Sequence, residues 1–189
     1  MSTAYKIDEQ SGAYYLTLQI VNWVDLFSRQ VYRDIVIENL RYCIAKKGLI
    51  VYGYVVMSNH VHLLVQSSKG ELSNTIRDFK SYTSKKFIQY IEQNNESRSE
   101  WLLSVFKGAA FSHKRNSKYQ VWTHENHAVH VYSDKFVTQK LDYIHMNPVR
   151  AGIVREPEDY IYSSACNYAG ESTVLPELEV LSLSVIVVK

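Results

Sequence analysis

The sequence has little of what several classes of protein require. Its 189 residues include only two cysteines, Cys43 and Cys166, which excludes a disulfide-stapled scaffold and a cysteine-rich zinc module. No run of about 18 apolar residues occurs, so we expect no membrane-spanning helix. Residues 1–10 are polar and lack the apolar centre of a signal peptide. We therefore expect a cytoplasmic protein.

Excess charge is also scarce, since the net charge is +2 at pH 7. Any contact with nucleic acid must then come from a local patch of cations.

Tyrosine, in contrast, is abundant, with 15 residues against 6 phenylalanines. A purely structural core has no need for this choice, whereas tyrosine suits half-wet positions that face a base or a partner.

The pattern of apolar residues predicts an α+β fold. We expect strands at 14–22, 49–57 and 60–66, and helices at 31–47, 71–93, 100–112 and 134–146. This order is most of the ferredoxin-like plan, an antiparallel sheet with helices packed on one face. The other face would remain available for a site. Pro148 predicts that the last helix ends at Asn147 or bends, and residues 174–189 fit either a strand or a helix.

Two histidines stand two residues apart in the third predicted strand. Side chains alternate along a strand, so His60 and His62 share one face while Val61 points to the other. Imidazoles about 7 Å apart along a strand can converge on one metal ion. The alternative is a pair of surface or interface histidines.

A tyrosine and a carboxamide stand one helical turn apart in the last predicted helix. Tyr143 and Asn147 share a face there and would project together. A phenol with a pKa near 10 is only about 0.1% phenolate at pH 7, so a metal or cation would have to assist it. The alternative is that Tyr143 packs against the sheet.

A basic stretch with interleaved aromatic residues runs from Lys80 to Lys118. Cations beside stacking surfaces suit single-stranded nucleic acid, although a solvated helix face explains such a run equally well. Including two positions outside the stretch, the candidate DNA contacts are Lys80, Lys85, Lys86, Lys114, Arg115, Lys118, His127 and Arg150.

Four short motifs in this order carry a resemblance to a known family. They are Val55-Val56-Met57-Ser58-Asn59-His60-Val61-His62-Leu63-Leu64, Tyr119-Gln120-Val121-Trp122 with Asn126-His127, Asp142 to Val154 (DYIHMNPVRAGIV), and Pro157-Glu158-Asp159-Tyr160 with Tyr162-Ser163-Ser164-Ala165. Residues 14–170 resemble the REP-associated tyrosine transposases, within the His-hydrophobic-His (HUH) single-strand transposases that use one tyrosine. Residues 171–189 match nothing in that pattern, so we expect a nuclease domain over 1–170 and an unassigned tail.

The resemblance implies a chemistry and roles for these residues. Tyr143 would be the nucleophile of a transposase that cleaves and rejoins hairpin-bearing single-stranded DNA through a 5′-phosphotyrosine. His60 and His62 would bind a divalent metal, Mg²⁺ or Mn²⁺, and Asn147 stands where a third ligand is expected. Histidine pairs alone favour transition metals, so the choice of Mg²⁺ or Mn²⁺ rests on the resemblance.

Several alternatives stay open at the level of sequence. Tyr82 is a rival nucleophile, with Lys86 one turn further along its helix to lower its pKa. The chain could be a non-catalytic nucleic-acid-binding module, a metal-dependent hydrolase of a small substrate, or a domesticated transposase. A homodimer that exchanges its tyrosine helices is equally open.

Overall fold

The structure is a computed structural model that describes residues 6–112 and 118–182. Within these ranges no helix combines the length and the apolar character needed to cross a bilayer. The main elements in chain order are β1 (Tyr14–Gln19), α1 (Gln30–Tyr42), β2 (Leu49–Val56), β3 (His60–Ser67), α2 (Leu72–Gln93), α3 (Ser99–Ser112), β4 (Val129–His130), α4 (Asp134–Arg150) and α5 (Ala165–Ala169).

The four strands form one antiparallel sheet in the order β2-β3-β1-β4. A short turn joins β2 to β3, and β1 pairs with β3 from Tyr14 opposite Val65 to Gln19 opposite His60. The strands β1 and β2 thus flank β3, which is the split β-α-β arrangement of the ferredoxin-like plan. The α+β class with an antiparallel sheet is confirmed.

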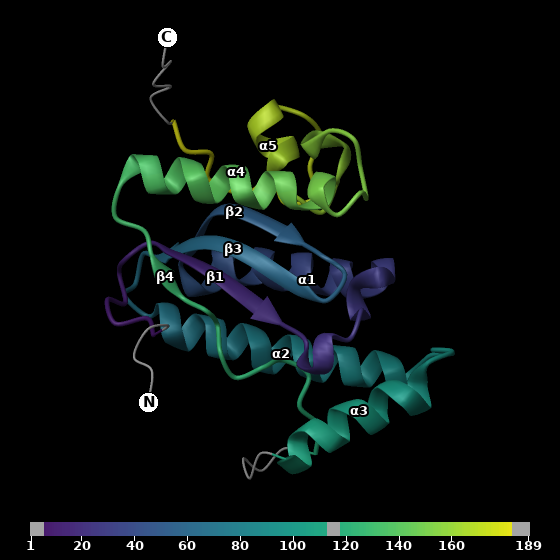
Figure 1. Cartoon of the computed structure of the whole chain (residues 1–189). Coiled ribbons are helices and arrows are strands. Elements are labelled where there is room, and N and C mark those ends of the chain that lie inside the picture. Colours follow the sequence, from purple (N-terminus) through teal and green to yellow (C-terminus); the bar gives the residue numbers. More distant parts are fainter. Residues whose placement is uncertain (1–5, 113–117, 183–189) are drawn as a thin grey trace.

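One face of the sheet packs against α1 and α2 (Figure 1). Leu16, Leu18 and Leu63 are fully buried on this side, as the alternation of strand residues requires. An aromatic cluster continues the core, because Phe27 lies 5.7 Å from Trp122 and 5.8 Å from Phe87 between ring centroids. This layer gives the sheet a rigid support.

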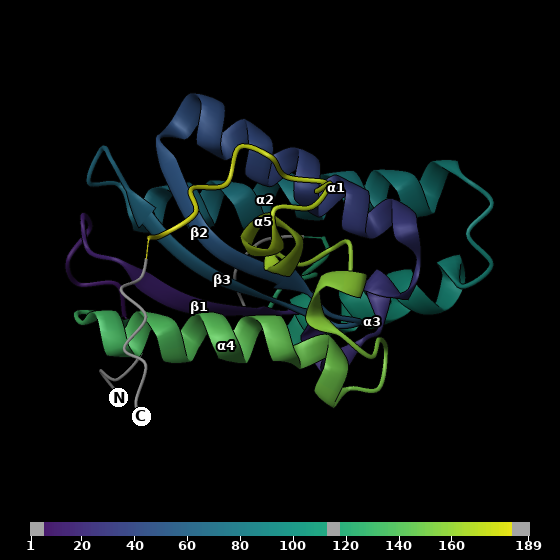
Figure 2. The same ribbon diagram turned by 90° about the horizontal axis from the view of Figure 1, so that it is seen from above.

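The helix α4 lies on the opposite face, which corrects the expectation that all helices share one face (Figures 1 and 2). The close approach depends on Gly53 in β2, where an added Cβ would come within 2.6 Å of Leu141 and 3.4 Å of Ile144. Apolar residues on the inner side of α4 need burial, and the exposed sheet face offers it. The face expected to be open is therefore partly covered.

The ends of α4 agree only in part with the expectation. Ser133 is the N-cap, and its side-chain oxygen accepts a hydrogen bond from the Phe136 amide at 3.4 Å. The C-terminal end is not at Asn147, because the helix continues through Pro148 to Arg150. A proline near a helix end removes one donor, and here the Ala151 amide still closes the last turn on the Asn147 carbonyl.

The segment after Gly170 packs on the edge of β2. Its described residues, up to 182, form neither helix nor strand. Leu175 and Leu178 are nevertheless buried, and the Glu179 amide donates to the Val51 carbonyl at 3.0 Å. The segment thereby covers part of an otherwise open sheet edge.

Candidate active site

The two histidines of β3 face each other on the sheet face that α4 covers. The Nε2 atoms of His60 and His62 are 3.1 Å apart. The His62 side chain is buried, with 4% of the residue exposed, while His60 is half-buried. The predicted alternation therefore brings both imidazoles to one point.

Neighbouring polar groups hold both rings through their Nδ1 atoms. The His60 Nδ1 lies 2.6 Å from the carboxamide oxygen of Asn59, to which it donates. The His62 Nδ1 lies 2.7 Å from the Tyr15 hydroxyl and 3.0 Å from the Thr17 hydroxyl on β1. Such outer partners fix the tautomer and the orientation of an imidazole that uses its other nitrogen as a ligand.

Burial keeps both imidazoles neutral. Desolvation, together with the nearby His60 and Lys140, lowers the pKa of His62 to about 3. Burial also lowers the pKa of His60. A neutral imidazole has a free lone pair for a metal ion, whereas an imidazolium has none.

The donor set fits a metal ion. When both rings carry their proton on Nδ1, the two Nε2 lone pairs face each other at 3.1 Å with no hydrogen between them. Two ligands at right angles around an ion, each about 2.1 Å away, would be about 3.0 Å apart. Among the described residues no group of three or more His, Cys, Asp or Glu completes such a site, so a third ligand from these residues would be of another type.

Tyr143 lies directly against the histidine pair. Its ring centroid is 5.4 Å from that of His62 and 6.1 Å from that of Tyr15, in edge-to-face contacts. The side chain is not sealed in the core, because 41% of the residue is exposed. Asn147 follows one turn later, and its Nδ2 donates to the Tyr143 carbonyl at 2.8 Å, which leaves its Oδ1 as a potential ligand.

Two cations flank Tyr143 on the same face of α4. The Lys140 ammonium lies 4.5 Å from the ring centroid of Tyr15, and the Arg150 guanidinium lies 5.5 Å from that of Tyr143. The spacing 140, 143, 147 and 150 follows one helical stripe. The stripe therefore presents a phenol and a carboxamide between two positive charges.

Lys80 is engaged in hydrogen bonds within the protein. Its ammonium is buried and donates to the Thr123 carbonyl and the Asn126 carboxamide, each at 2.7 Å. Burial lowers its pKa to about 8. The side chain ties residues 123–126 to α2, which gives Lys80 a structural role.

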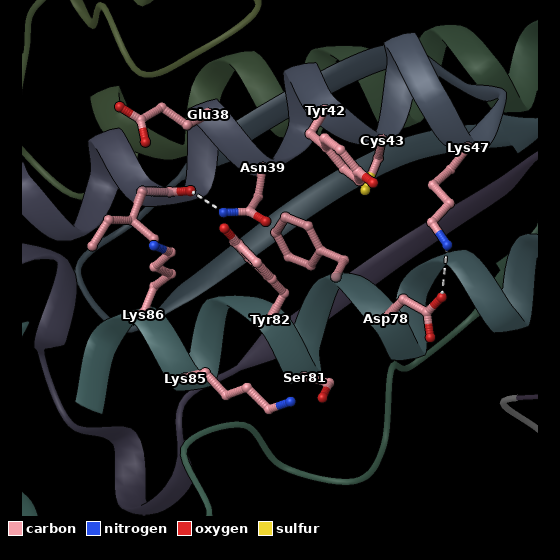
Figure 3. Close-up of a pocket in the computed structure, with 12 residues that line it drawn as sticks. Glu38, Asn39, Tyr42, Cys43, Lys47, Asp78, Ser81, Tyr82, Lys85 and Lys86 are labelled. Atoms are coloured by element: carbon pink, nitrogen blue, oxygen red, sulfur yellow. Dashed lines mark hydrogen bonds and ion pairs between the residues drawn. The ribbon is translucent and has the colours of Figure 1, made fainter. Parts of the chain in front are cut away.

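Tyr82, the rival nucleophile, lies on the opposite face of the sheet from the histidines. It lines a cleft of about 770 Å³ between α1 and α2 together with Lys85 and Lys86 (Figure 3). The Lys86 ammonium is 5.5 Å from the Tyr82 ring centroid. An ion pair between Lys47 and Asp78 at 3.1 Å spans the same cleft. Tyr82 thus has a cation beside it but not the histidine pair.

The remaining candidate contacts lie in different surroundings. Lys118 is exposed and pairs with Glu92 at 3.7 Å. His127 is 42% exposed in its side chain and lies 3.8 Å from the Glu125 carboxylate. Lys114 and Arg115 lie outside the described residues.

Sequence reasoning missed the residues that support the site. Tyr15 and Thr17 are 45 to 47 positions away from His62 along the chain. The only signal for them is the register of β1 on β3, which alternation alone does not give. The position of Lys140 beside the site could have been predicted from the sequence, because it precedes Tyr143 by one helical turn.

Comparison with known proteins agrees with this geometry. A solved structure described as "Structure of the REP associates tyrosine transposase bound to a REP hairpin" matches with a TM-score of 0.61 and 15% identity, covering 100% of both chains. At this identity the likeness concerns the fold. No curated protein matches the chain. The family model "Transposase IS200 like" matches residues 13–147, well over half of the sequence. The chain therefore belongs to the family of IS200-like transposases.

Proposed function

We propose that this transposase cleaves and rejoins single-stranded, hairpin-bearing DNA in a metal-dependent reaction through a 5′-phosphotyrosine. The observation that carries the proposal is the position of Tyr143 against His60 and His62 of its own chain, at 5.4 Å between the ring centroids of Tyr143 and His62. The matching solved structure was described with a bound REP hairpin, which supports the same class of substrate here.

Tyr143 is the nucleophile in this proposal. Its phenol oxygen forms a bond to the scissile phosphorus, and the bond from phosphorus to the 3′ oxygen breaks. The phenol proton leaves to solvent, and the departing 3′ oxygen takes up a proton to become a hydroxyl. A later attack by a 3′-hydroxyl reverses these bonds and releases Tyr143. One ester replaces another, so the reaction needs no nucleotide cofactor.

His60, His62 and Asn147 are the residues that would hold a divalent metal, Mg²⁺ or Mn²⁺. When bound, the ion would stabilise negative charge on the phosphate. Tyr15, Thr17 and Asn59 would keep the Nε2 atoms directed to one point through their hydrogen bonds to Nδ1. The buried site would keep these imidazoles neutral near pH 7.

The two cations on α4 would bind the DNA strand on either side of the reacting phosphate. Ten residues of helix separate Lys140 from Arg150, which is about 15 Å. Arg150 lies over the face of Tyr143 and would place a positive charge beside the reacting phosphate. Other cations of the basic stretch would contact the hairpin: the exposed Lys85, Lys86 and Lys118, and Lys114 and Arg115, which lie outside the described residues.

A covalent-adduct assay tests the proposal. The protein is incubated with a labelled DNA hairpin that carries single-stranded flanks, with Mg²⁺ or Mn²⁺, and then denatured on a gel. The wild type and Tyr82→Phe should both form a covalent protein–DNA band, and Tyr143→Phe should form none. EDTA should abolish the band, and added Mg²⁺ should restore it.

Two outcomes would contradict the proposal in different ways. An adduct formed by Tyr143→Phe would remove Tyr143 as the nucleophile. Tight binding of the hairpin by the wild type, with no adduct under any metal, would instead indicate a non-catalytic or domesticated nucleic-acid-binding protein on the same fold.

A further inference from the structure

A polar hollow opens beside the histidine pair, at the end of β1 that is nearest to α3. It has a volume of about 660 Å³ and lies between the turn after β1, the helix α3 and the segment 120–127. Figures 1 and 2 show β1 running toward the end of the molecule that carries α3. None of the residues assigned above to catalysis or metal binding lines this hollow.

One residue of β1 relates the polar hollow to the histidine pair. Gln19 lines it and is the antiparallel partner of His60 in the sheet. Paired strands are about 4.8 Å apart, so the hollow begins one strand away from a candidate metal ligand. A DNA strand whose phosphate lies at His60 would reach the hollow with its adjoining nucleotides.

Hydrogen bonds fix the walls of the hollow in advance. The Thr123 amide donates to the Gln19 carbonyl at 2.8 Å, and the Val21 amide donates to the Val121 carbonyl at 2.8 Å. The buried ammonium of Lys80 holds the same segment through the Thr123 carbonyl at 2.7 Å. A binding site with fixed walls loses little conformational entropy when a ligand enters.

The backbone at the rim is strained. Asn22 and Trp23 have φ of +53° and +56°, and His127 has φ of +42°. Non-glycine residues rarely adopt this region of φ, and such residues concentrate at ligand-binding sites. Trp23, which is 65% exposed, directly follows Asn22, a residue that lines the hollow.

The lining suits a nucleobase better than a phosphate. Gln19, Asn22 and Thr123 offer amide and hydroxyl groups of the kind that pair with base edges. Glu125 also lines the hollow, and its carboxylate would repel a phosphate but accept a hydrogen bond from a base amino group. The exposed indole of Trp23 can stack on a base, as aromatic side chains do in proteins that bind single strands.

We propose that the polar hollow holds an unpaired nucleobase of the DNA strand next to the scissile phosphate. Trp23 provides the stacking surface at the rim, and Gln19, Asn22 and Thr123 contact the edge of the base. The inference rests on the proposed function for the identity of its ligand as single-stranded DNA, and it adds a site that selects the nucleotide beside the cleavage point.

Binding without cleavage tests this site. The dissociation constants of a bare DNA hairpin and of the same hairpin with a single-stranded extension are measured by fluorescence anisotropy in EDTA. Trp23→Ala removes the stacking surface, and Gly108→Phe fills the hollow from α3, where an added Cβ meets nothing within 4 Å. Both variants should bind the extended hairpin about tenfold more weakly and the bare hairpin as the wild type does.

A matched control and an abasic scan sharpen the result. Tyr132→Ala, which removes an exposed aromatic side chain at the other end of β1, should bind both DNAs like the wild type. In the wild type, one abasic position in the extension should weaken binding by about tenfold, and in Trp23→Ala the same position should have little effect. Equal affinity of the wild type for both DNAs, or unchanged binding by both hollow variants, would overturn the site.

The adduct assay separates this inference from the proposed function. If Tyr143 forms an adduct but no abasic position in the extension weakens binding, the nucleobase site is rejected and the proposed nuclease activity stands. A position-specific abasic effect without any adduct would keep the nucleobase site and reject the nuclease.

Discussion

The properties of His62 depend on its neighbours more than on the imidazole itself. Its ring is buried under α4, and two hydroxyls of β1 bind its Nδ1. The alternation of β3 was enough to predict that His60 and His62 share a face. It could not reveal Tyr15 or Thr17, because those contacts depend on the register between two strands far apart in sequence.

Removing the Tyr15 hydroxyl should weaken metal binding. Burial raises the pKa of Tyr15, so its phenol stays protonated and bound to His62. Loss of such an outer partner typically costs 10- to 100-fold in affinity for the ion. Because the Thr17 hydroxyl remains, we expect Tyr15→Phe to lower Mn²⁺ affinity by about tenfold, measured by isothermal titration calorimetry without DNA.

The neighbouring tyrosine is the control for this change. Tyr14 points to the other face of β1, where its hydroxyl accepts a hydrogen bond from the Glu9 amide. Tyr14→Phe should keep the wild-type Mn²⁺ affinity. If Tyr15→Phe binds Mn²⁺ as tightly as Tyr14→Phe does, the hydroxyl does not support the site.

His145 should make the fold sensitive to acid. Burial lowers its pKa from 6.5 to about 4, and its Nε2 lies 2.9 Å from the Ser164 hydroxyl. Between these values the unfolded chain binds a proton that the folded chain does not, so the free energy of unfolding falls as the pH drops from about 6.5 to about 4. The loss attributable to His145 is at most about 3 kcal/mol.

Urea denaturation of wild type and His145→Gln across this pH range measures the effect. The variant should lose less stability on acidification than the wild type. Part of the acid sensitivity should remain, because burial also lowers the pKa of His62 to about 3. Identical pH slopes for the two proteins would show that His145 is not the titrating group.

At the scale of elements, α4 decides whether the site exists. The spacing of Tyr143 and Asn147 predicted that they share a helix face. Spacing alone did not predict that this face would meet the histidines, because the covering of a sheet face depends on tertiary packing. That expectation came from the family resemblance. The presence of Pro148 predicted that the helix ends at Asn147 or bends there, whereas α4 continues to Arg150 and brings this residue over Tyr143.

The substitution Gly53→Ala should disturb the packing of α4 against the sheet. The added Cβ would approach Leu141 to 2.6 Å in a packed layer. Overpacking of this kind typically costs about 1–3 kcal/mol. We expect Gly53→Ala to lower the free energy of unfolding by this amount and to slow adduct formation, because Tyr143 stands half a turn after Leu141.

A double-variant cycle separates this contact from a general effect of alanine. Leu141→Ala frees the space that the new methyl group requires. The combined variant Gly53→Ala with Leu141→Ala should therefore be more stable than the sum of the two single effects predicts. Strict additivity would show that Gly53 and Leu141 do not limit the packing of α4.

Contacts between segments that are far apart in the sequence are not visible in a local pattern of charges or apolar residues. Lys80 belongs to a run of cations that favours DNA binding, yet its ammonium is committed to protein oxygens. The acceptors are a backbone carbonyl and a carboxamide more than 40 residues away, which leave no trace in the local pattern. The strained turn at Asn22 and Trp23 was likewise hidden, because the strand was expected to continue to residue 22.

At the scale of the whole molecule, one chain supplies every part of the site. The split β-α-β plan sets His60 and His62 at the middle of the sheet, and the chain returns in α4 to place Tyr143 on them. We therefore expect cleavage in cis, with each chain using its own tyrosine, whether or not two chains associate.

Mixing two inactive variants tests this arrangement. His60→Ala loses a proposed metal ligand, and Tyr143→Phe loses the proposed nucleophile. In a cis arrangement their equimolar mixture should form no adduct with hairpin DNA. Recovery of a substantial part of the wild-type adduct would show that the tyrosine helix serves the histidines of a partner chain.

The central claim is that Tyr143 becomes covalently linked to DNA. The most direct measurement is mass spectrometry of the protease-digested adduct formed with a flanked hairpin and Mg²⁺ or Mn²⁺. We predict a single modified peptide from α4 with the DNA phosphate on Tyr143. A phosphotyrosine at Tyr82 or at any other position, with Tyr143 unmodified, would contradict the account.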